Sequence, residues 1–486
     1  MKNKIAKNYL YNLIYQLFLI VIPVFVTPYV AHILGDVQSG YYSFSSSIVS
    51  YFILLASLGF GYYAQREIAK YQNDKAKQSI SFWEIVIIKF FTMLLSLALY
   101  LITIKTGIFG EQYMPLMLIL SLNIVATAFD VTFIFRGNEN FKTIILRNIA
   151  IKISVVLCIF IFVKDANDLW KYALIESAGI LLGNLVLCIS LKGNLAKITL
   201  KELRPIRHLA PALILFLPSI AVSIYTSLDK TLIGIITHSG SENGNYEYAE
   251  KIIKMALTFV TSLGVVMIPR NSQMNATHGH KSIEHNINLS QHFVFLLGIP
   301  LAFGCAVIAD NFIPWYLGPD YTKAATLMKI LSPLIVIIGL SNVYGLQFLI
   351  PTNKDKKFTF AILCGACINF ILNIILINLL QSYGAAIATI VAETAVTLIM
   401  KTYVDHYIKN GHAFRKALKP FIAGAIMYSI GYILSRNYLS PSISHTIILV
   451  TICATIYTIS IAILRDSLFL TILHKIRESI LKHNKD

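Results

Sequence analysis

The sequence predicts an all-α, polytopic membrane protein with about fourteen transmembrane helices. Of its 486 residues, 56% are hydrophobic and only 13% are charged, whereas about 25% of the residues of a typical soluble domain are charged. The mean hydropathy is +0.68. A spanning helix needs about 20 apolar residues, so about fourteen of them use roughly 280 positions and leave short loops and ends. This composition excludes an ordinary soluble enzyme, and within this chain it leaves no length for an added catalytic domain.

Apolar segments follow one another along the chain, separated by short polar connections. Each is predicted to be a helix, because a helix satisfies its own backbone hydrogen bonds within lipid. The segments lie at about 9–34, 41–64, 80–104, 113–135, 143–163, 168–191, 208–236, 246–269, 290–313, 322–350, 358–379, 384–404, 416–436 and 443–464. The first segment follows basic residues, as a signal peptide does, but it is longer and meets no small-residue cleavage site. We therefore expect it to be the first transmembrane helix.

Basic residues are distributed unevenly between alternate connections, and this predicts the orientation. If the N-terminus is cytoplasmic, the cytoplasmic segments hold 30 of the 41 Lys and Arg residues and the outside loops hold four. Short loops rich in Lys and Arg stay on the cytoplasmic side, so both termini are predicted to be cytoplasmic. The net charge of +17 is then explained by loops that face anionic lipid headgroups, and no nucleic-acid partner is expected.

Motifs from the first half of the chain recur in the second half. Leu34-Gly35, Gly40-Tyr41-Tyr42 and Ser57-Leu58-Gly59 are matched in the same order by Ile233-Gly234, Gly244-Asn245-Tyr246 and Ser262-Leu263-Gly264. Phe141 and Glu176 are 35 residues apart, as are Phe358 and Glu393. These matches predict two halves of the same topology, related by a parallel repeat.

The repeat gives the predicted domain organisation. Spans 1–6 form an N-lobe, residues 1–207, and spans 7–12 form a C-lobe, residues 208–410. Residues 411–464 add two C-terminal helices. In residues 465–486 apolar and basic side chains alternate at helical spacing, which predicts an amphipathic tail on the cytoplasmic face.

Charged residues also lie inside the predicted spans, where each costs about 2.5–3.5 kcal/mol if it faces lipid. They are Lys89, Asp130, Arg147, Lys152, Glu176, Asp229, Lys230, Glu250, Lys251, Lys254 and Glu393. Most of them are therefore expected to face a water-filled cavity or one another.

Glu250 and Lys254 are four residues apart in the order that favours a helical ion pair. Such a pair is either a structural salt bridge near the interface or part of one wall of a central cavity. Asp229 and Lys230 are adjacent in the sequence, so their side chains point about 100° apart on a helix. One of them is therefore expected to face the helix that carries Glu250 and Lys254.

Two further positions leave alternatives open. Lys152 lies deep in its span and either binds a phosphate or pairs with Glu176 or Asp130. Glu393 lies among small residues that permit close helix packing, and it is either a protonatable coupling site or a neutral, hydrogen-bonded carboxylic acid. The sequence contains no Walker loop, no His-Glu-x-x-His motif and no nucleophile elbow. The histidines after the eighth span have neither thiolate partners nor a ligand spacing. We therefore expect no catalytic residue, metal or cofactor.

Several runs resemble the signature motifs of a known family. The run 129–142, followed by Arg147-Asn148, resembles the fourth-span signature of bacterial polysaccharide repeat-unit flippases. Other runs that resemble this family are 227–234, 246–251, 314–318, 342–347 and 351–354. The likeness extends from about residue 5 to residue 460. By this resemblance the chain is identified as a member of the Wzx-type, polysaccharide-transport branch of the multidrug/oligosaccharidyl-lipid/polysaccharide (MOP) exporter superfamily.

The resemblance implies a flippase with two six-helix lobes around a V-shaped cavity. It implies that undecaprenyl-pyrophosphate-linked oligosaccharide repeat units pass from the inner to the outer leaflet of the bacterial plasma membrane, for capsule, O-antigen or exopolysaccharide synthesis. The implied mechanism is alternating access coupled to an ion gradient or the membrane potential, in a monomer that is not an enzyme. The expected partners are the lipid-linked substrate, membrane lipids, and the polysaccharide polymerase and assembly machinery.

A pyrophosphate is strongly anionic, so cationic residues of the spans are its candidate ligands. The predicted substrate-binding residues are Arg147, Lys152, Lys230, Lys251 and Lys254. The candidates for ion coupling are Asp130, Asp229, Glu250 and Glu393. The cationic candidates follow from the negative charge of the pyrophosphate. The resemblance itself identifies neither the lysine that binds the substrate nor the ion that is coupled to transport.

The sequence leaves three alternatives to the flippase. Two belong to the same superfamily: a multidrug or cation antiporter, and a flippase for a peptidoglycan lipid precursor. A cation exporter favours acidic cavity residues, whereas basic residues are at least as frequent in these spans. The third is a membrane glycan polymerase, which needs a sizeable outside loop with catalytic groups, and the predicted outside loops are short.

Overall fold

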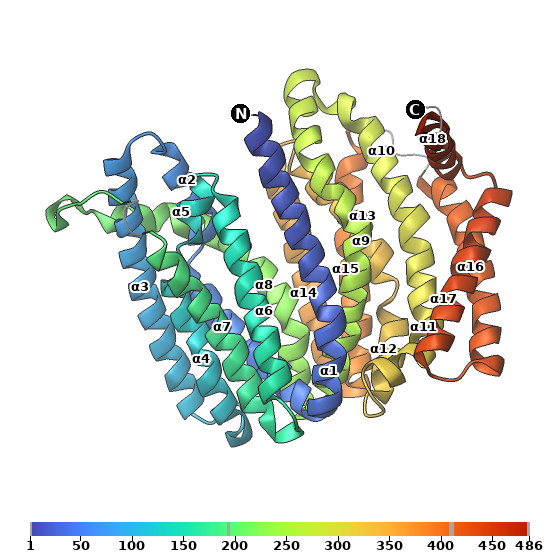
Figure 1. Ribbon diagram of the computed structural model, residues 1–486, viewed down its shortest axis with the longest axis horizontal. Helices are drawn as coiled ribbons and strands as arrows, with labels where there is room; N and C mark the ends of the chain where they lie inside the picture. Colours follow the sequence, from blue (N-terminus) through green and yellow to red (C-terminus); the bar gives the residue numbers. More distant parts are fainter. Residues whose placement is uncertain (1, 192–194, 408–412, 484–486) are drawn as a thin grey trace. The chain divides into compact units, whose positions relative to one another are not determined.

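The computed structural model describes residues 2–191, 195–407 and 413–483. In this part of the chain all regular secondary structure is helical (Figure 1), which confirms the predicted all-α fold. The chain divides into two compact units, Met1–Gly244 and Asn245–Asp486. The predicted lobes, 1–207 and 208–410, have different boundaries from these units and remain a prediction.

The first unit contains the helices up to α8 and the first residues of α9. Their bounds are α1 Lys2–Ser57, α2 Phe60–Lys70, α3 Lys75–Lys105, α4 Met114–Ala128, α5 Thr132–Gly137, α6 Phe141–Phe162, α7 Leu169–Ile189, α8 Leu209–Thr237 and α9 Gly240–His278. Short 3-10 turns lie at Glu111–Tyr113, Ala166–Asp168, Leu200–Glu202 and Pro205–His208.

The second unit contains the rest of α9 and the helices that follow it. A 3-10 turn at His280–Ile283 precedes α10 Glu284–Phe293, and the π-helical segments η6 Val294–Gly298 and η7 Gly345–Leu349 follow α10 and α13. The other bounds are α11 Ile299–Tyr316, α12 Thr322–Leu331, α13 Leu334–Tyr344, α14 Asp355–Leu380, α15 Ser382–Asp405, α16 Ala413–Tyr438, α17 Ile443–Ile463 and α18 Ser467–His483.

The helices are long and apolar enough for a polytopic membrane protein. Among the described residues, eleven helical stretches meet this requirement, or twelve if the bent pair Thr322–Leu331 and Leu334–Leu349 is one span. α1 contains the predicted span 9–34 and the first part of the predicted span 41–64, and it bends between them at Gly35, where φ is 72°. α8 covers the predicted span 208–236. The membrane-spanning fold is therefore confirmed, and the count of about fourteen spans is compatible with it but remains a prediction.

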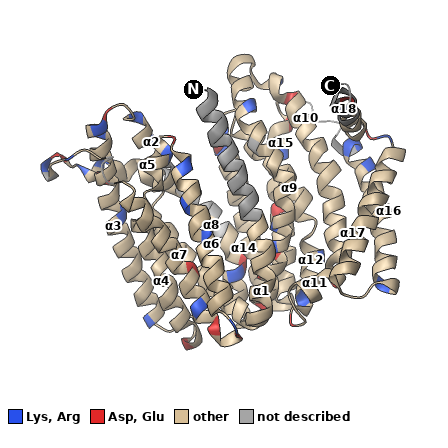
Figure 2. Ribbon diagram, viewed as in Figure 1, with Lys and Arg blue, Asp and Glu red and all other residues tan. Residues whose placement is uncertain are grey.

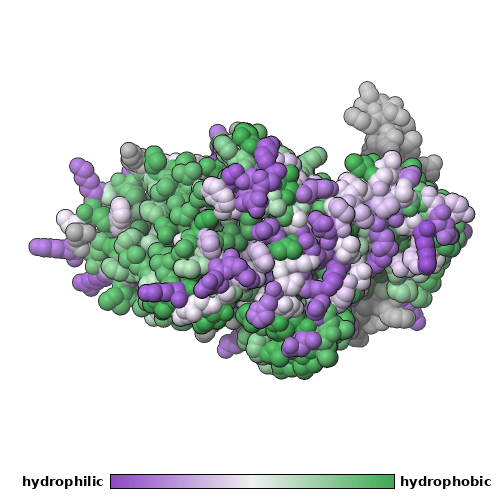
Figure 3. Space-filling model, turned by 90° about the horizontal axis from the view of Figure 1, so that it is seen from below, coloured by the Kyte–Doolittle hydropathy of each residue, from purple (hydrophilic) through white to green (hydrophobic). Residues whose placement is uncertain are grey.

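The outward-facing side chains of the helices are mostly apolar. Phe91, Leu95, Ile102, Ile161 and Leu379 are each more than half exposed, which would favour aggregation in water but suits contact with lipid. Charged residues lie mainly toward the helix ends (Figure 2). Figure 3 shows one face, on which both hydrophilic and hydrophobic residues are exposed.

Two predicted spans are divided by breaks that position polar groups. α1 ends at Ser57, and Leu58 and Gly59, with φ of 41° and 73°, separate it from α2. The predicted span 113–135 is divided into α4 and α5. Between them, the Asp130 side chain accepts hydrogen bonds from the backbone N–H and the hydroxyl of Thr132, at 3.0 and 2.7 Å. Such local bonds compete with the helical pattern.

Candidate functional site

A cavity of about 210 Å³ lies between α6 and α7 in the first unit. It is lined by Arg147, Asn148, Ile151, Lys152, Val155, Glu176, Gly179, Ile180 and Asn184. The sequence had singled out its charged members. It named Asn148 only as part of the family signature and did not name Asn184, although Asn184 lies eight residues after Glu176, about two helical turns further along α7.

Lys152 and Glu176 form an ion pair in this cavity. The Lys152 Nζ lies 3.0 and 3.3 Å from the two carboxylate oxygens of Glu176. The two side chains are 35% and 20% exposed, so the pair is partly accessible. Of the partners left open by the sequence for Lys152, the structure selects Glu176 over Asp130. A role of Lys152 in binding substrate remains a prediction.

Small residues of α7 allow α6 to approach closely at this cavity. A Cβ atom on Gly179 would lie 2.3 Å from a methyl group of Val155. A Cβ atom on Gly183 would lie 2.7 Å from the Arg147 Nη1, so the guanidinium packs against the bare backbone of α7. The Asn184 Nδ2 donates to the Ala126 carbonyl at 2.8 Å and so connects α7 to α4. The charged groups of the cavity are thus held on closely packed helices.

A second buried cluster surrounds the break between α4 and α5. Lys89 of α3 is buried, and its Nζ donates to the backbone carbonyl of Asp130. The same ammonium lies 5.4 Å from the centre of the Phe133 ring, a cation–π contact. Lys89 therefore supplies a hydrogen-bond donor to the backbone of the break. The coupling candidate Asp130 supplies its carboxylate to Thr132, and its predicted role is untested.

Asp229 and Lys230 lie on α8 where it packs against α1. Asp229 is buried, and the backbone carbonyl of Lys230 accepts a hydrogen bond from the Asn243 amide at 2.7 Å. Neutral hydroxyl pairs join the two helices nearby: Ser50 with Ser227 at 3.1 Å, Tyr51 with Thr231 at 3.0 Å, and Thr231 with Ser47 at 2.9 Å. The α1–α8 contact is therefore a polar seam.

The charged stripe of α9 lies in the second unit. The Glu250 and Lys254 side chains form the predicted ion pair, with the Nζ 2.6 Å from a carboxylate oxygen. The Lys251 Nζ lies 5.6 Å from the centre of the Tyr248 ring, and that ring packs edge-on against Tyr321. This ion pair is compatible with both alternatives that the sequence left open, a structural salt bridge near the interface and part of one wall of a central cavity.

Glu393 is buried on α15, at 9% exposure. One turn before it, the Thr389 hydroxyl lies 3.3 Å from the hydroxyl of Tyr246. One turn after it, the Thr397 hydroxyl donates to the Ile337 carbonyl at 3.1 Å. The carboxyl group thus lies on a packed helix face, which is compatible with both of its expected roles.

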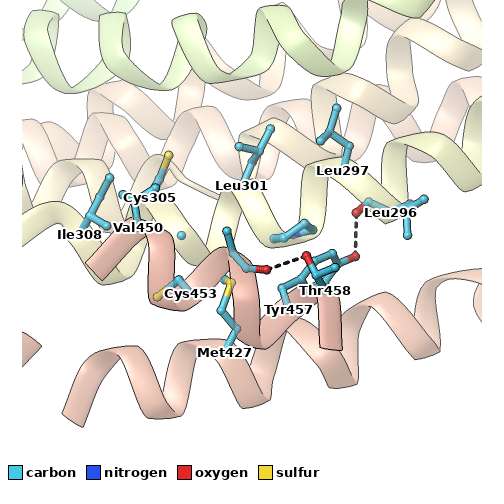
Figure 4. Close-up of a pocket in the computed structure, with 13 residues that line it drawn as sticks. Leu296, Leu297, Leu301, Cys305, Ile308, Met427, Val450, Cys453, Tyr457 and Thr458 are labelled. Carbon is cyan, nitrogen blue, oxygen red and sulfur yellow. Dashed lines mark hydrogen bonds between the residues drawn. The ribbon is translucent and has the colours of Figure 1, made fainter. Parts of the chain in front are cut away.

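A larger cavity of about 310 Å³ lies between α11, α16 and α17 (Figure 4). Its lining is hydrocarbon and sulfur, with the hydroxyl groups of Tyr457 and Thr458. Both hydroxyls donate to backbone carbonyls, Tyr457 to Leu296 and Thr458 to Ala454, each at 2.7 Å. This cavity therefore offers no charged group to an anion, in contrast to the α6–α7 cavity.

Comparison with known proteins places these features in a family context. The family described as polysaccharide biosynthesis protein matches residues 5–275. A protein of Escherichia coli (strain K12) named "Putative O-antigen transporter" is 26% identical over 410 residues, which are 83% of this chain and 97% of that protein.

Two solved structures show a similar fold. The lipid II flippase MurJ, in an inward closed conformation, has a TM-score of 0.77 at 16% identity, over 94% of this chain and 98% of that chain. An inward-facing multidrug resistance MATE family transporter of the MOP superfamily has a TM-score of 0.59 at 12% identity, over 82% of this chain and 94% of that chain.

Proposed function

Because this chain belongs to the polysaccharide biosynthesis protein family, we propose that it is a flippase for pyrophosphate-linked oligosaccharides carried on a polyprenyl lipid. Family membership and the MOP-type fold confirm the resemblance found in the sequence. The direction, from the inner to the outer leaflet of the bacterial plasma membrane, is part of the proposal. So are alternating access, the V-shaped cavity, cytoplasmic termini and the polymerase and assembly partners.

The α6–α7 cavity is the observation that carries the proposal. It brings two cationic side chains, Arg147 and Lys152, beside one carboxylate, Glu176, within apolar helices. Charge interactions are stronger there than in water. A pyrophosphate carries more negative charge than one carboxylate, so it can replace Glu176 as the partner of Lys152. The amides of Asn148 and Asn184 offer further polar contacts for the headgroup.

The polar seam between α1 and α8 supports a transport cycle. A neutral hydrogen bond contributes only about 0.5–1.5 kcal/mol, because water can replace either partner. Hydroxyl pairs such as Ser50 with Ser227 can therefore separate and become hydrated at small cost.

We assign ion coupling to the buried acids Asp229 and Glu393, with Asp130 and Glu250 as further candidates. Lys230, Lys251 and Lys254 are further candidate ligands of the substrate.

Transport by the purified chain in lipid vesicles tests the proposal. A fluorescent polyprenyl-pyrophosphate oligosaccharide is placed in the inner leaflet, and a glycan-modifying enzyme added outside scores its exposure. We expect protein-dependent exposure that falls at least about tenfold in Lys152→Met, because a charge-assisted contact is worth about 1.5–3 kcal/mol. Lys329→Met is the matched control, since Lys329 is 33% exposed and pairs with one carboxylate, that of Asp310.

A charge swap separates substrate binding from stability. Lys152→Glu combined with Glu176→Lys retains an ion pair between α6 and α7. We expect the swapped chain to fold but to transport poorly, because the cation then projects from the other helix. Full transport by the swapped chain would show that the pair is structural. Absence of lipid exposure under every ion gradient, together with efflux of a cationic dye, would instead identify a drug antiporter.

A further inference from the structure

Two lysines converge on one tyrosine at the end of the helices that the sequence predicts to face the cytoplasm. Lys354 immediately precedes α14, Lys357 lies in its first turn, and Tyr407 follows the end of α15. The Lys354 Nζ lies 3.7 Å from the centre of the Tyr407 ring. The Lys357 Nζ lies 5.0 Å from the same point and donates to the Tyr407 hydroxyl at 3.0 Å.

This arrangement places two positive charges together, although the exposed Asp355 lies between the two lysines in the sequence. Among the described residues, neither Lys354 nor Lys357 forms a salt bridge. The nearby Asp405 of α15 is bound by Lys401 at 2.5 Å. The Tyr407 ring and the Tyr403 ring, 4.9 Å from the Lys357 Nζ, attract the cations by cation–π contacts but do not neutralise them. A concentrated positive charge therefore remains.

The backbone and the neighbouring rings hold the two lysines in place. The Lys354 N–H donates to the Leu349 carbonyl at 2.8 Å, across a turn in which Asn353 has a φ of 58°. The Tyr407 ring packs edge-on against His280, with ring centres 5.7 Å apart. The N-terminus of α14, which begins at the next residue, adds the positive end of a helix dipole. The cationic groups are thus preorganised.

The pKa of the Tyr407 phenol reflects the positive potential of the two lysines. Its hydrogen bond from Lys357, together with the neighbouring Lys354, lowers the pKa of the Tyr407 hydroxyl below its ordinary value. Both ammonium groups favour the phenolate over the phenol. Any anion that occupies this position should weaken that effect.

We propose that Lys354, Lys357 and Tyr407 form a binding site for a phosphate group. This phosphate site belongs to the second unit and shares no residue with the α6–α7 cavity. The shared ligand chemistry is a phosphate or pyrophosphate oxyanion, whose charge and several acceptor oxygens match two ammonium groups and a hydroxyl. The oxyanion can belong to a lipid headgroup in the adjacent leaflet or to a soluble phosphate compound. The inference does not depend on transport, because it concerns binding at one end of the helices.

The test measures the ionisation of Tyr407 in the full chain. The protein is labelled with tyrosine carrying carbon-13 at Cζ and placed in nanodiscs, and Tyr407→Phe identifies the signal. Three samples are compared: nanodiscs of a phosphate-free glycolipid alone, the same nanodiscs with inorganic pyrophosphate, and nanodiscs of the same glycolipid mixed with phosphatidylglycerol. We expect the pKa of Tyr407 to rise when phosphate binds. A rise with pyrophosphate identifies a soluble ligand, and a rise only with phosphatidylglycerol identifies a lipid headgroup.

Variants separate the site from general surface charge. Lys354→Met and Lys357→Met should each weaken the apparent affinity at least about tenfold, because each removes a charge-assisted contact. Lys401→Met is the matched control, since Lys401 lies at the same helix end but is already bound to Asp405. Circular dichroism confirms that each variant is folded. An unchanged Tyr407 pKa in all three samples, or equal responses in wild type and the Lys354→Met/Lys357→Met double variant, would overturn the proposal.

Discussion

Gly183 and Gly179 occupy neighbouring turns of α7, but a methyl group added at each would meet a different neighbour. At Gly183 the methyl meets the end of the flexible Arg147 side chain, and at Gly179 it meets a Val155 methyl in the packed helix contact. We expect Gly179→Ala to lower the free energy of unfolding by about 1–3 kcal/mol through overpacking. Gly183→Ala should stay within about 1 kcal/mol of wild type, because Arg147 can move aside.

The two glycine variants should differ in transport as well. Displacement of Arg147 by Gly183→Ala changes the cationic cavity, so transport of the pyrophosphate-linked probe should fall while thermal unfolding in detergent is unchanged. Thermal unfolding followed by circular dichroism and the vesicle assay together check this. If Gly183→Ala lowers stability as much as Gly179→Ala and leaves transport intact, Arg147 serves packing alone.

At the residue scale, the sequence could predict charges but not their partners. Lys152 and Glu176 were recognised because charges inside apolar spans are costly. Their pairing depends on how α6 and α7 pack together, and Gly179 and Gly183 allow the two helices to approach closely. Lys89 is predicted from the sequence as a charge inside a span that faces water or another charge, but its acceptor is a backbone carbonyl at a helix break, and no side-chain pattern identifies such a partner.

At the element scale, the Ser-Leu-Gly motif has two conformations. Ser57-Leu58-Gly59 ends α1 with two residues of positive φ, whereas Ser262-Leu263-Gly264 lies inside the continuous α9. A Cβ atom on Gly59 would lie 2.7 Å from the Ala212 carbonyl oxygen. The repeat was therefore visible in the sequence, but the break was not, because it depends on contact with α8.

Substitution of Gly59 tests the need for glycine at this break. We expect Gly59→Ala to lower the free energy of unfolding by about 1–3 kcal/mol, because alanine is strained at a φ of 73° and the facing atom is backbone. Gly61→Ala is the control, because that position in α2 faces open space. It should stabilise the chain by up to about 1 kcal/mol. Chemical unfolding in detergent compares them, and equal effects at both positions would contradict a special role for Gly59.

Asp466 supports the start of α18 and contacts α10. Its carboxylate accepts hydrogen bonds from the backbone N–H groups of Leu468 and Phe469, at 3.0 and 3.1 Å, and lies 2.9 Å from the His292 Nε2. Burial alone would raise the pKa of this carboxyl. The bonds from His292 and the backbone outweigh burial, so the pKa is lowered below its ordinary value.

A lowered pKa means that the Asp466 carboxylate stabilises the fold above its unfolded pKa of about 3.9 and stops doing so as pH falls through the folded value. We expect Asp466→Ala to lower the free energy of unfolding by about 1–2 kcal/mol at pH 7, as the loss of a helix cap does. Asp466→Asn should lose less, since asparagine also caps helices. Melting temperatures at pH 7, 5 and 3 provide the measurement. The difference between wild type and each variant should shrink only at the lowest pH, and a constant difference would exclude a charge effect.

At the scale of the whole molecule, equivalent turns support the internal repeat. Glu139, after α5, and Asn353, after η7, have φ of 56° and 58°. In each case the next N–H donates to a carbonyl five residues earlier, at 2.8 Å. The sequence predicted matching halves, but not a left-handed Glu139, because glutamate is not typical of that conformation. Helix breaks and merged spans also explain why the number of spans is harder to predict than the fold class.

The final prediction concerns the orientation of the whole chain. Because basic residues are concentrated in alternate connections, Lys77 is expected to be cytoplasmic and Ser440 to be outside. In a cysteine-free background, Ser440→Cys should react with a membrane-impermeant maleimide on intact cells. Lys77→Cys should react only after permeabilisation. Both positions are exposed at helix ends, so access in the folded chain is matched. The reverse labelling pattern would invert the topology, and it would place the Lys354–Tyr407 phosphate site beside the headgroups of the outer leaflet instead of the inner leaflet.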